Sequence, residues 1–242
     1  MRKFNNNFIG YPINTSMKFS GSDNEERFEK NLKTQPHDWY YRNAEITYDY
    51  NEYGHRCKNV SEIDLDNYIL FSGCSHTEGI GLELEKTFPY LISNSLGIDY
   101  YNLALGGSGI DTMTYNLIAW INTVKKPPKA VIIFWTYETR FLSMHDDDSV
   151  TFRLPTVSGG KLSRSISPVD NTSRFMILGE DIGYFVSKKK LLQRMVNLSY
   201  SDSNIIDMNI TSYSNFDFAR DLMHSGIMSQ QVIAKKILDK LS

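Results

Sequence analysis

The middle of the chain alternates short apolar runs with amphipathic stretches, and this order limits the possible folds more than any other feature. The apolar runs, at residues 68–71, 98–104 and 130–135, have the length and the β-branched and aromatic content of buried strands. The stretches between them, at residues 84–96 and 112–124, carry apolar side chains at helical spacing. Strands that alternate with helices form a parallel sheet covered by helices. We therefore expect a three-layer α/β/α domain with a flavodoxin-like parallel sheet.

The segments on either side of this core have different patterns. Residues 1–60 are polar and Asn-rich and then aromatic, with strand-like alternation at residues 46–50, so we expect an N-terminal arm or hairpin packed on a main domain of residues 61–242. Within that domain, charged, Gly and Ser residues at about 145–215 indicate a central insertion, and long insertions in α/β enzymes often cover a site. Two further helices and a weak strand are expected at residues 182–198, 229–241 and 204–210.

Composition excludes several classes of function. The chain has 242 residues with 26 Lys+Arg against 28 Asp+Glu, a balance that does not suit binding of nucleic acid or of an anionic membrane by charge. The longest apolar run, residues 130–135, is far shorter than the roughly 20 residues of a membrane span. Asparagines at residues 5–7 stand where a signal peptide needs apolar residues. Two cysteines, Cys57 and Cys74, cannot form a disulfide framework or a four-cysteine zinc site. These observations favour a cytoplasmic, globular protein.

Residues suited to nucleophilic chemistry follow the predicted strands. Ser75 comes just after the first strand among small neighbours, where a sharp turn can expose its hydroxyl. A glycine-rich loop at residues 106–109 follows the second strand and can bring backbone N–H groups close to an oxyanion. Near the C-terminal helix, Asp221 and His224 are spaced so that a carboxylate can orient an imidazole. Because ligands bind at the carboxyl ends of parallel strands, a serine, a base and an orienting carboxylate there indicate acyl transfer.

Three motifs resemble those of the SGNH (GDSL-type) hydrolases. Residues 73–79, Gly-Cys-Ser-His-Thr-Glu-Gly, are similar to the family's first motif, Gly-Asp-Ser-Leu-Thr-x-Gly. Residues 102–107, Asn-Leu-Ala-Leu-Gly-Gly, are similar to the second motif, and residues 221–224, Asp-Leu-Met-His, to the last. Two other stretches, at residues 50–56 and 87–91, fit bacterial and viral members. The resemblance covers about residues 45–140 and 217–240.

The resemblance implies a serine esterase with Ser75 as nucleophile, His224 as general base and Asp221 as the residue that orients it. It also implies that the backbone N–H groups of Ser75 and Gly107 bind the oxyanion, with Gly106 in the same loop. The substrate would be an O-acylated glycan or a small ester, and neither a metal nor an organic cofactor would be required. The sequence leaves the oligomeric state open.

Two positions depart from the family pattern. Cys74 replaces the Asp before the nucleophile, a position that supports geometry and does not act as the base. Tyr137 stands where the third motif has an Asn that donates to the oxyanion, and a phenol reaches further than an amide. Loss of one oxyanion donor costs on the order of 10²–10³ in turnover. The alternatives are therefore a catalytically silent binding or structural module, for instance in a virus particle, or an O-acetyltransferase that uses the same residues.

Several neighbouring residues have competing interpretations. Cys74 could itself be the nucleophile, because a thiolate is intrinsically stronger, but a side chain before an exposed turn residue usually points elsewhere. His76 is expected at the surface or in contact with the substrate. Arg140 could bind a substrate carboxylate or phosphate, or it could pair with Glu138 or Asp146.

Three further features have a simple structural explanation beside a functional one. The stretch His-Asp-Asp-Asp at residues 145–148 could bind a hard cation, although a solvated acidic loop is the simpler interpretation. Lysines at residues 188–190 are expected on an exposed helix face and not in a nucleic-acid patch. The aromatic residues between 39 and 50 could stack on a sugar, but packing of the N-terminal arm explains them as well.

Overall fold

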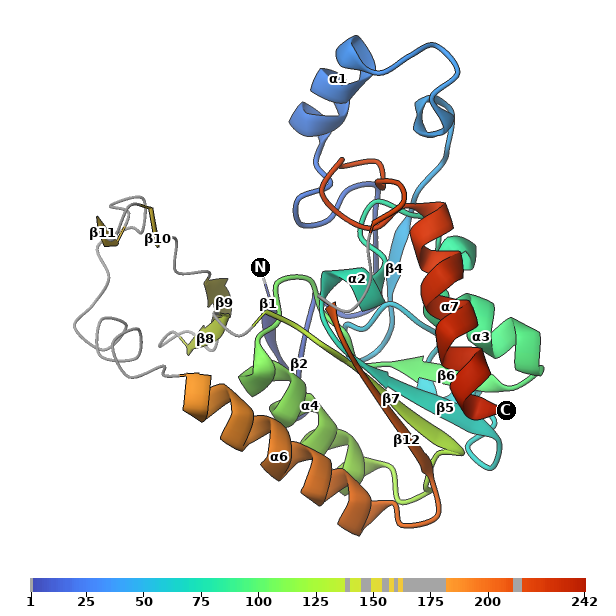
Figure 1. Ribbon diagram of the computed structural model, residues 1–242, viewed down its shortest axis with the longest axis vertical. Coiled ribbons are helices and arrows are strands. Elements are labelled where there is room, and N and C mark those ends of the chain that lie inside the picture. Colours follow the sequence, from blue (N-terminus) through green and yellow to red (C-terminus); the bar gives the residue numbers. More distant parts are fainter. Residues whose placement is uncertain are drawn as a thin grey trace.

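The computed structural model contains a central parallel sheet of four strands (Figure 1). It describes residues 2–137, 140–144, 149–153, 157–158, 161–162, 182–210 and 215–242. The strands of the sheet are β5 (Tyr68–Ser72), β6 (Asp99–Asn102), β7 (Ala130–Trp135) and β12 (Asn204–Asn209). Their order is β12-β7-β5-β6, so the chain order reverses direction between β5 and β7, as in a flavodoxin-like sheet.

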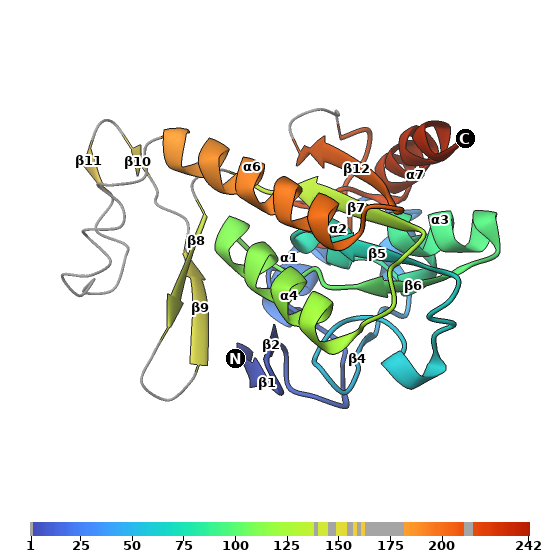
Figure 2. The same cartoon turned by 90° about the horizontal axis from the view of Figure 1, so that it is seen from below.

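Helices cover both faces of this sheet. On one face lie α4 (Ile110–Thr123) and α6 (Ile182–Ser199), and on the other lie α3 (Phe88–Leu96) and α7 (Ile227–Leu241) (Figure 1, Figure 2). Each face has its own buried cluster, because alternate residues of the strands point to opposite sides of a sheet. In β7, Val131 packs toward α4 and α6, and Ile132 toward α3 and α7. The predicted three-layer α/β/α fold is confirmed.

The predicted elements of the core agree with the structure except at some ends. The strand at 130–135 has the predicted bounds, and the helices at 112–124, 182–198 and 229–241 shift by at most two residues. The helix expected from residue 84 begins only at Phe88, after a 3-10 turn at Leu84–Lys86. Thr87 is extended at φ −79° and ψ 146°, and Pro89 stands in the first turn, where a missing N–H does no harm.

The N-terminal residues form strands that pair with distant parts of the chain. Strand β1 (Arg2–Asn5) pairs with β2 (Phe8–Gly10) and also with β9 (Ser149–Arg153), in an antiparallel sheet of order β2-β1-β9-β8. The other strands among the described residues are β3 (Thr15–Met17), β4 (Tyr48–Tyr50), β8 (Phe141–Met144), β10 (Val157–Ser158) and β11 (Lys161–Leu162). The same part of the chain also contains the helices α1 (Glu25–Thr34) and α2 (Ser75–Glu78) and the 3-10 turns Tyr40–Arg42 and Val60–Glu62.

A third buried cluster joins the N-terminal residues to the loops of the central sheet. Tyr48 and Tyr50 of β4 are buried in it together with Leu105 and Ala219, which come from the loop after β6 and the segment before α7. Tyr40, by contrast, is about half exposed. Most of the aromatic side chains between residues 39 and 50 are therefore packing residues.

Two lysines of α6 are less exposed than predicted and have partners in neighbouring elements. Lys188 forms an ion pair with Asp111 of α4 and is half-buried. Lys189 lies 3.5 Å from the Asp207 carboxylate and 4.9 Å from the centre of the Trp135 ring. The first two lysines thus attach α6 to the sheet and to its neighbouring helix. In the described part of the chain, no helix combines the length and the apolar composition that a bilayer span needs.

Candidate active site

Ser75 is placed by a sharp change from strand to helix. Strand β5 ends at Ser72, and α2 begins at Ser75, so the backbone turns within two residues. Gly73 is required in this turn, because a Cβ there would lie 2.1 Å from the Thr77 hydroxyl oxygen. As the first residue of α2, Ser75 has a backbone N–H without a partner inside the helix. The turn therefore presents both the hydroxyl and the N–H of Ser75 at the carboxyl end of β5.

A chain of two hydrogen bonds connects Ser75 to the loop before α7. The Ser75 Oγ lies 2.7 Å from Nε2 of His224, and Nδ1 of His224 lies 2.6 Å from Oδ2 of Asp221. An ionised carboxylate only accepts, so Nδ1 carries the proton and Nε2 is left as the acceptor for the serine hydroxyl. The three side chains that the motifs predicted as nucleophile, base and orienting residue are thus connected in series through His224.

The loop that carries Asp221 and His224 is held by its own backbone. Oδ1 of Asp221 accepts hydrogen bonds from the N–H groups of Met223 and His224, at 3.0 and 3.1 Å. Leu222 has a positive φ of 55°, which lets the chain fold back so tightly. Burial would raise the pKa of Asp221, but hydrogen bonds from His224, Ser22 and Met223 lower it to about 2. The carboxylate is therefore ionised whenever the protein is folded near neutral pH.

The contact with Ser22 is a part of the site that the sequence motifs do not reveal. Its hydroxyl donates to Oδ2 of Asp221 at 2.7 Å, across 199 residues of sequence. The next residue, Asp23, forms a buried ion pair with Arg220 at 2.7 Å. Neither residue belongs to a motif, and no local pattern could have marked them.

The glycine loop after β6 is tied to α2. The N–H of Gly106 donates to the carboxylate of Glu78, and the carbonyl of Gly106 accepts from Arg2. Because the Gly106 N–H is engaged, it cannot at the same time donate to a substrate oxygen. Gly107 follows with a φ of 80°, a conformation that favours glycine. Of the two glycines predicted at the oxyanion, Gly107 therefore remains the candidate donor.

Tyr137 and Arg140 follow β7 and contact each other. Tyr137 is 45% exposed, and the Arg140 guanidinium lies 5.2 Å from the centre of its ring. Arg140 is buried and donates to the Thr136 hydroxyl at 3.0 Å, while its Nε has no hydrogen-bond partner among the described residues. Its charge also contributes to the low pKa of His76, so the guanidinium lies near the serine site. Glu138 and Asp146, the alternative partners of Arg140, lie outside the described residues.

His76 is buried, so the expected position at the surface is wrong, while the alternative, a contact with the substrate, stays a prediction. Its Nδ1 lies 2.5 Å from the Ser225 hydroxyl, and its ring centre lies 4.9 Å from that of His224. Burial, together with the nearby charges of His224 and Arg140, lowers the pKa of His76 to about 3. The error has a simple cause: α2 is only one turn long, and all four of its residues are buried.

Cys74 lies in the apolar cluster between the sheet and the layer of α3 and α7. It is fully buried there with Phe71 and Phe88. This position agrees with the interpretation that the Cys74 side chain points away from the exposed turn. The acidic stretch at residues 145–148 lies outside the described residues. Among those that are described, no three His, Cys, Asp or Glu side chains gather as a metal site requires.

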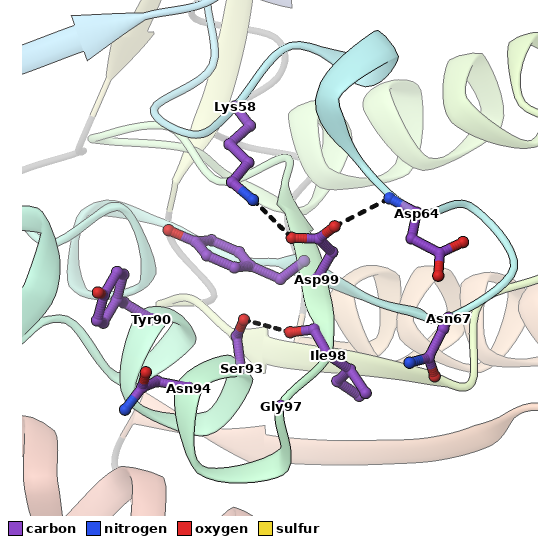
Figure 3. A pocket seen from close by; sticks show the side chains of 10 residues that line it. Lys58, Asp64, Asn67, Tyr90, Ser93, Asn94, Gly97, Ile98 and Asp99 are labelled. Carbon is purple, nitrogen blue, oxygen red and sulfur yellow. Dashed lines mark hydrogen bonds and ion pairs between the residues drawn. The ribbon is translucent and has the colours of Figure 1, made fainter.

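Two cavities differ in their distance from this site. One, of about 400 Å³, is lined by Lys58, Tyr90 and Asp99 among others and lies at the amino ends of β5 and β6, away from Ser75 (Figure 3). Its Asp99 carboxylate is already occupied by Lys58 at 2.8 Å and by a backbone N–H. The other, of about 360 Å³, borders Asp221 and is lined on the opposite side by polar and charged residues of α1 and its N-cap. These are Asn24, Glu26, Arg27, Lys30 and Asn31.

Comparison with known proteins finds similarity only among solved structures. No family model and no curated protein matches the sequence. A lipolytic protein of the G-D-S-L family from Veillonella parvula is 13% identical over 72% of this chain and 97% of its own, with a TM-score of 0.41. An acetyl xylan esterase from Butyrivibrio proteoclasticus is 15% identical over 76% and 64% of the two chains, with a TM-score of 0.40. An esterase from Pseudoalteromonas sp. is 14% identical over 73% and 97%, with a TM-score of 0.38.

The order of the strands and the positions of the motifs on them are observations on this chain alone. Ser75 follows β5, the Gly106-Gly107 pair follows β6, and Asp221 and His224 precede the last helix, all at the carboxyl edge of a doubly wound parallel sheet. In fold and in the placement of its motifs, the chain resembles the SGNH (GDSL-type) hydrolases.

Proposed function

We propose that the protein is a serine esterase that acts by acyl transfer through Ser75, with His224 as general base and Asp221 as its orienting carboxylate. The observation that carries the proposal is the pair of hydrogen bonds of 2.7 and 2.6 Å that connects these side chains. A serine hydroxyl is a weak nucleophile near neutral pH and needs an adjacent base. The distance of 2.7 Å between Nε2 of His224 and the Ser75 Oγ supports His224 as that base.

The mechanism follows from this arrangement. As the Ser75 Oγ bonds to the carbonyl carbon of the ester, its proton passes to Nε2 of His224, and Asp221 stabilises the resulting imidazolium. The carbonyl oxygen becomes an oxyanion, which the backbone N–H groups of Ser75 and Gly107 bind. Collapse of this intermediate breaks the bond to the alcohol, which leaves with the proton from His224. Water then attacks the acyl-enzyme by the same steps and releases the acid.

An O-acylated glycan or a small ester is the substrate class that we propose, as the resemblance of the motifs implies. The polar cavity that borders Asp221 does not bear on this choice, because neither Ser75 nor His224 lines it. Transfer of the acyl group to a sugar in place of water would use the same first half-reaction.

The proposal is tested by labelling with a fluorophosphonate, which reacts with activated serines, followed by peptide mapping. We expect one adduct, on Ser75, that is absent in Ser75→Ala and strongly reduced in His224→Ala. Hydrolysis of acetylated sugars should depend on the same residues, and product analysis with a sugar acceptor present distinguishes transfer from hydrolysis. An adduct on Cys74, or an esterase rate unchanged in Ser75→Ala, would contradict the mechanism. A folded wild-type protein with no adduct and no turnover would favour the silent binding module.

A further inference from the structure

The Asp221 carboxylate is buried, and its hydrogen bonds come from two distant parts of the chain. Its own loop supplies three donors: the N–H groups of Met223 and His224 to Oδ1 and the His224 Nδ1 to Oδ2. A further donor, to Oδ2, is the hydroxyl of Ser22 at 2.7 Å. Asp221 is 1% exposed, so water cannot readily replace a donor that is lost.

Ser22 stands in a segment that is itself firmly held. Backbone hydrogen bonds of 2.9 and 3.1 Å join Ser20 and Asp23 around it. The Asp23 carboxylate accepts from the Tyr48 hydroxyl at 2.5 Å and from Arg220 at 2.7 Å. Two consecutive N-terminal residues, Ser22 and Asp23, thus bind two consecutive residues of the other segment, Arg220 and Asp221. Figure 1 shows the same juxtaposition: the loop before α7 lies beside the N-terminal segment that leads into α1.

We propose that Ser22 is a positioning residue of the Ser75 site, which fixes the Asp221 carboxylate so that His224 faces the serine in its reactive tautomer. The inference rests on the proposed function and extends the site to the N-terminal segment. Ser22 Oγ also lies 3.4 Å from Nδ1 of His224, so hydroxyl, carboxylate and imidazole form a closed triangle. The loop's own donors come from residues 223 and 224 alone, and Ser22 adds a donor from a distant segment on the oxygen that accepts from His224, which limits rotation of the carboxylate away from the imidazole.

The Ser22 hydroxyl also limits how strongly the carboxylate holds the proton of the imidazolium. Oδ2 shares its lone pairs between Ser22 and His224, so removal of the Ser22 donor leaves more negative charge facing Nδ1. Other charged and titratable groups face His224 as well. The ring of His76 in α2 lies 4.9 Å from that of His224, the charge of Arg140 after β7 acts on His76, and Arg27 of α1 contacts Met223, the residue before His224. All of them are unchanged when only Ser22 is replaced.

The experiment compares Ser22→Ala with Ser22→Thr, which keeps the hydroxyl, and with Ser16→Ala. Ser16 is exposed on β3 in the same N-terminal region and is the matched control. We expect Ser22→Ala to lower kcat about tenfold, with KM within about twofold, since a hydrogen bond to a charged group is lost and substrate is not touched. The acid limb of the pH–rate profile should move to higher pH, because the imidazolium is then held more tightly. Ser22→Thr should restore most of the kcat and most of the position of the acid limb, and Ser16→Ala should match the wild type in both quantities.

A second readout does not depend on turnover. The hydrogen-bonded Nδ1 proton of His224 gives a far-downfield proton resonance in NMR, assigned by its loss in Asp221→Asn. The chemical shift of this resonance should change in Ser22→Ala and return to the wild-type value in Ser22→Thr. Unchanged kcat, pH profile and resonance in Ser22→Ala would overturn the positioning role while leaving Ser75 as nucleophile. If Ser75 is not labelled in the wild type, the esterase proposal fails, and the resonance alone then decides whether Ser22 orders the Asp221–His224 pair.

Discussion

Arg140 is a candidate for the oxyanion donor that the third motif lacks. The residue that takes the place of the motif's Asn, Tyr137, is half exposed, whereas Arg140 is buried beside it. The Arg140 Nε has no partner among the described residues, and its charge contributes to the low pKa of the adjacent His76. A buried guanidinium can stabilise a charge that develops only in the transition state. This makes Arg140 a better candidate than Tyr137.

We predict that Arg140→Met lowers kcat by about two orders of magnitude, the typical cost of one lost oxyanion interaction. Tyr137→Phe, which removes only a hydroxyl from a ring that stays in place, should change kcat by less than about threefold. Both variants are measured with the same acetylated substrate and with fluorophosphonate labelling, whose adduct places a polarised phosphoryl oxygen in the site. A larger decrease in kcat in Tyr137→Phe than in Arg140→Met would instead assign the oxyanion donor to the Tyr137 hydroxyl.

At the residue scale, the sequence predicts the site residues that lie in short motifs and misses those that reach the site only through a contact between distant segments. Ser75, Asp221 and His224 lie within short motifs whose spacing has a chemical reason, and the structure brings their side chains together. Ser22 is connected to them by one contact across 199 residues, which leaves no periodicity or spacing to detect. The position of His76 next to the nucleophile suggests the surface, but its burial depends on the packing around α2 and not on the neighbour in sequence.

At the scale of elements, one histidine joins the N-terminal strands to the central domain. His55 follows the turn after β4, and its Nδ1 lies 2.9 Å from the Tyr101 hydroxyl of β6. Its Nε2 lies 3.3 Å from the side-chain amide of Asn116 in α4, and that amide group also bonds both backbone groups of Ile9 in β2. Burial lowers the pKa of His55 to about 3. The ring is therefore neutral in the folded protein, with both nitrogens in use.

This burial predicts a loss of stability on acidification. Between the ordinary histidine pKa of 6.5 and the folded value of about 3, the unfolded chain binds a proton at His55 that the folded chain does not. The free energy of unfolding therefore falls as pH decreases below 6.5, by up to about 1.4 kcal/mol per pH unit for this group. His76, whose pKa is also lowered to about 3, acts in the same direction.

The measurement is urea unfolding of the wild type and of His55→Gln at pH 7, 6 and 5. His55→Gln should be less stable at pH 7 because it loses packing, but its stability should fall less steeply with pH. His37→Gln is the control, since His37 is exposed and the substitution is the same. An equal slope in wild type and His55→Gln would show that His55 accepts its proton without unfolding.

Strands β5, β6 and β7 of the central sheet are predictable because each lies in a short apolar run bounded by turn residues, whereas β12, with Asp207 in its middle, gives only a weak signal. The strands of the second sheet, β2-β1-β9-β8, cannot be predicted in this way. Strand β1 pairs with β9 through Arg2 opposite Val150, so its register depends on segments almost 150 residues apart. Short strands of this kind have no local pattern that distinguishes the correct partner from another. For the same reason, the sequence separates residues 1–60 as an arm without revealing which parts of the core they contact.

At the scale of the whole molecule, Glu78 connects the N-terminal region, the serine helix and the glycine loop. Its carboxylate is fully buried and accepts from the Tyr50 hydroxyl at 2.9 Å and from the Gly106 N–H. Burial raises the pKa of Glu78, while the positive charges of Arg2 and Arg56 act to lower it. Both arginines also hold the backbone here, Arg2 at Gly106 and Arg56 at the carbonyl of Gly79.

Removal of this carboxylate should therefore affect folding and turnover together. Glu78→Ala leaves the Tyr50 hydroxyl and the Gly106 N–H without their acceptor and removes the buried negative charge near Arg2 and Arg56, and we expect it to lower the free energy of unfolding by about 3–5 kcal/mol. Glu78→Gln keeps an oxygen for the Gly106 N–H and should cost clearly less. Because the loop that carries Gly107 is no longer held in place, kcat should fall in Glu78→Ala even at temperatures where the protein is folded.

Denaturant unfolding and ester turnover are measured on the same preparations, with Glu85→Ala as the exposed control. The Glu78 carboxylate connects Tyr50 to Gly106, and Arg2 binds the carbonyl of Gly106, so the N-terminal region and the central sheet should unfold in a single transition in the wild type. Two separate transitions in Glu78→Ala would show that this carboxylate couples them. If Glu78→Ala lowers the free energy of unfolding by less than about 1 kcal/mol, water hydrates the arginines when the carboxylate is removed. The three segments are then joined mainly by their apolar cluster.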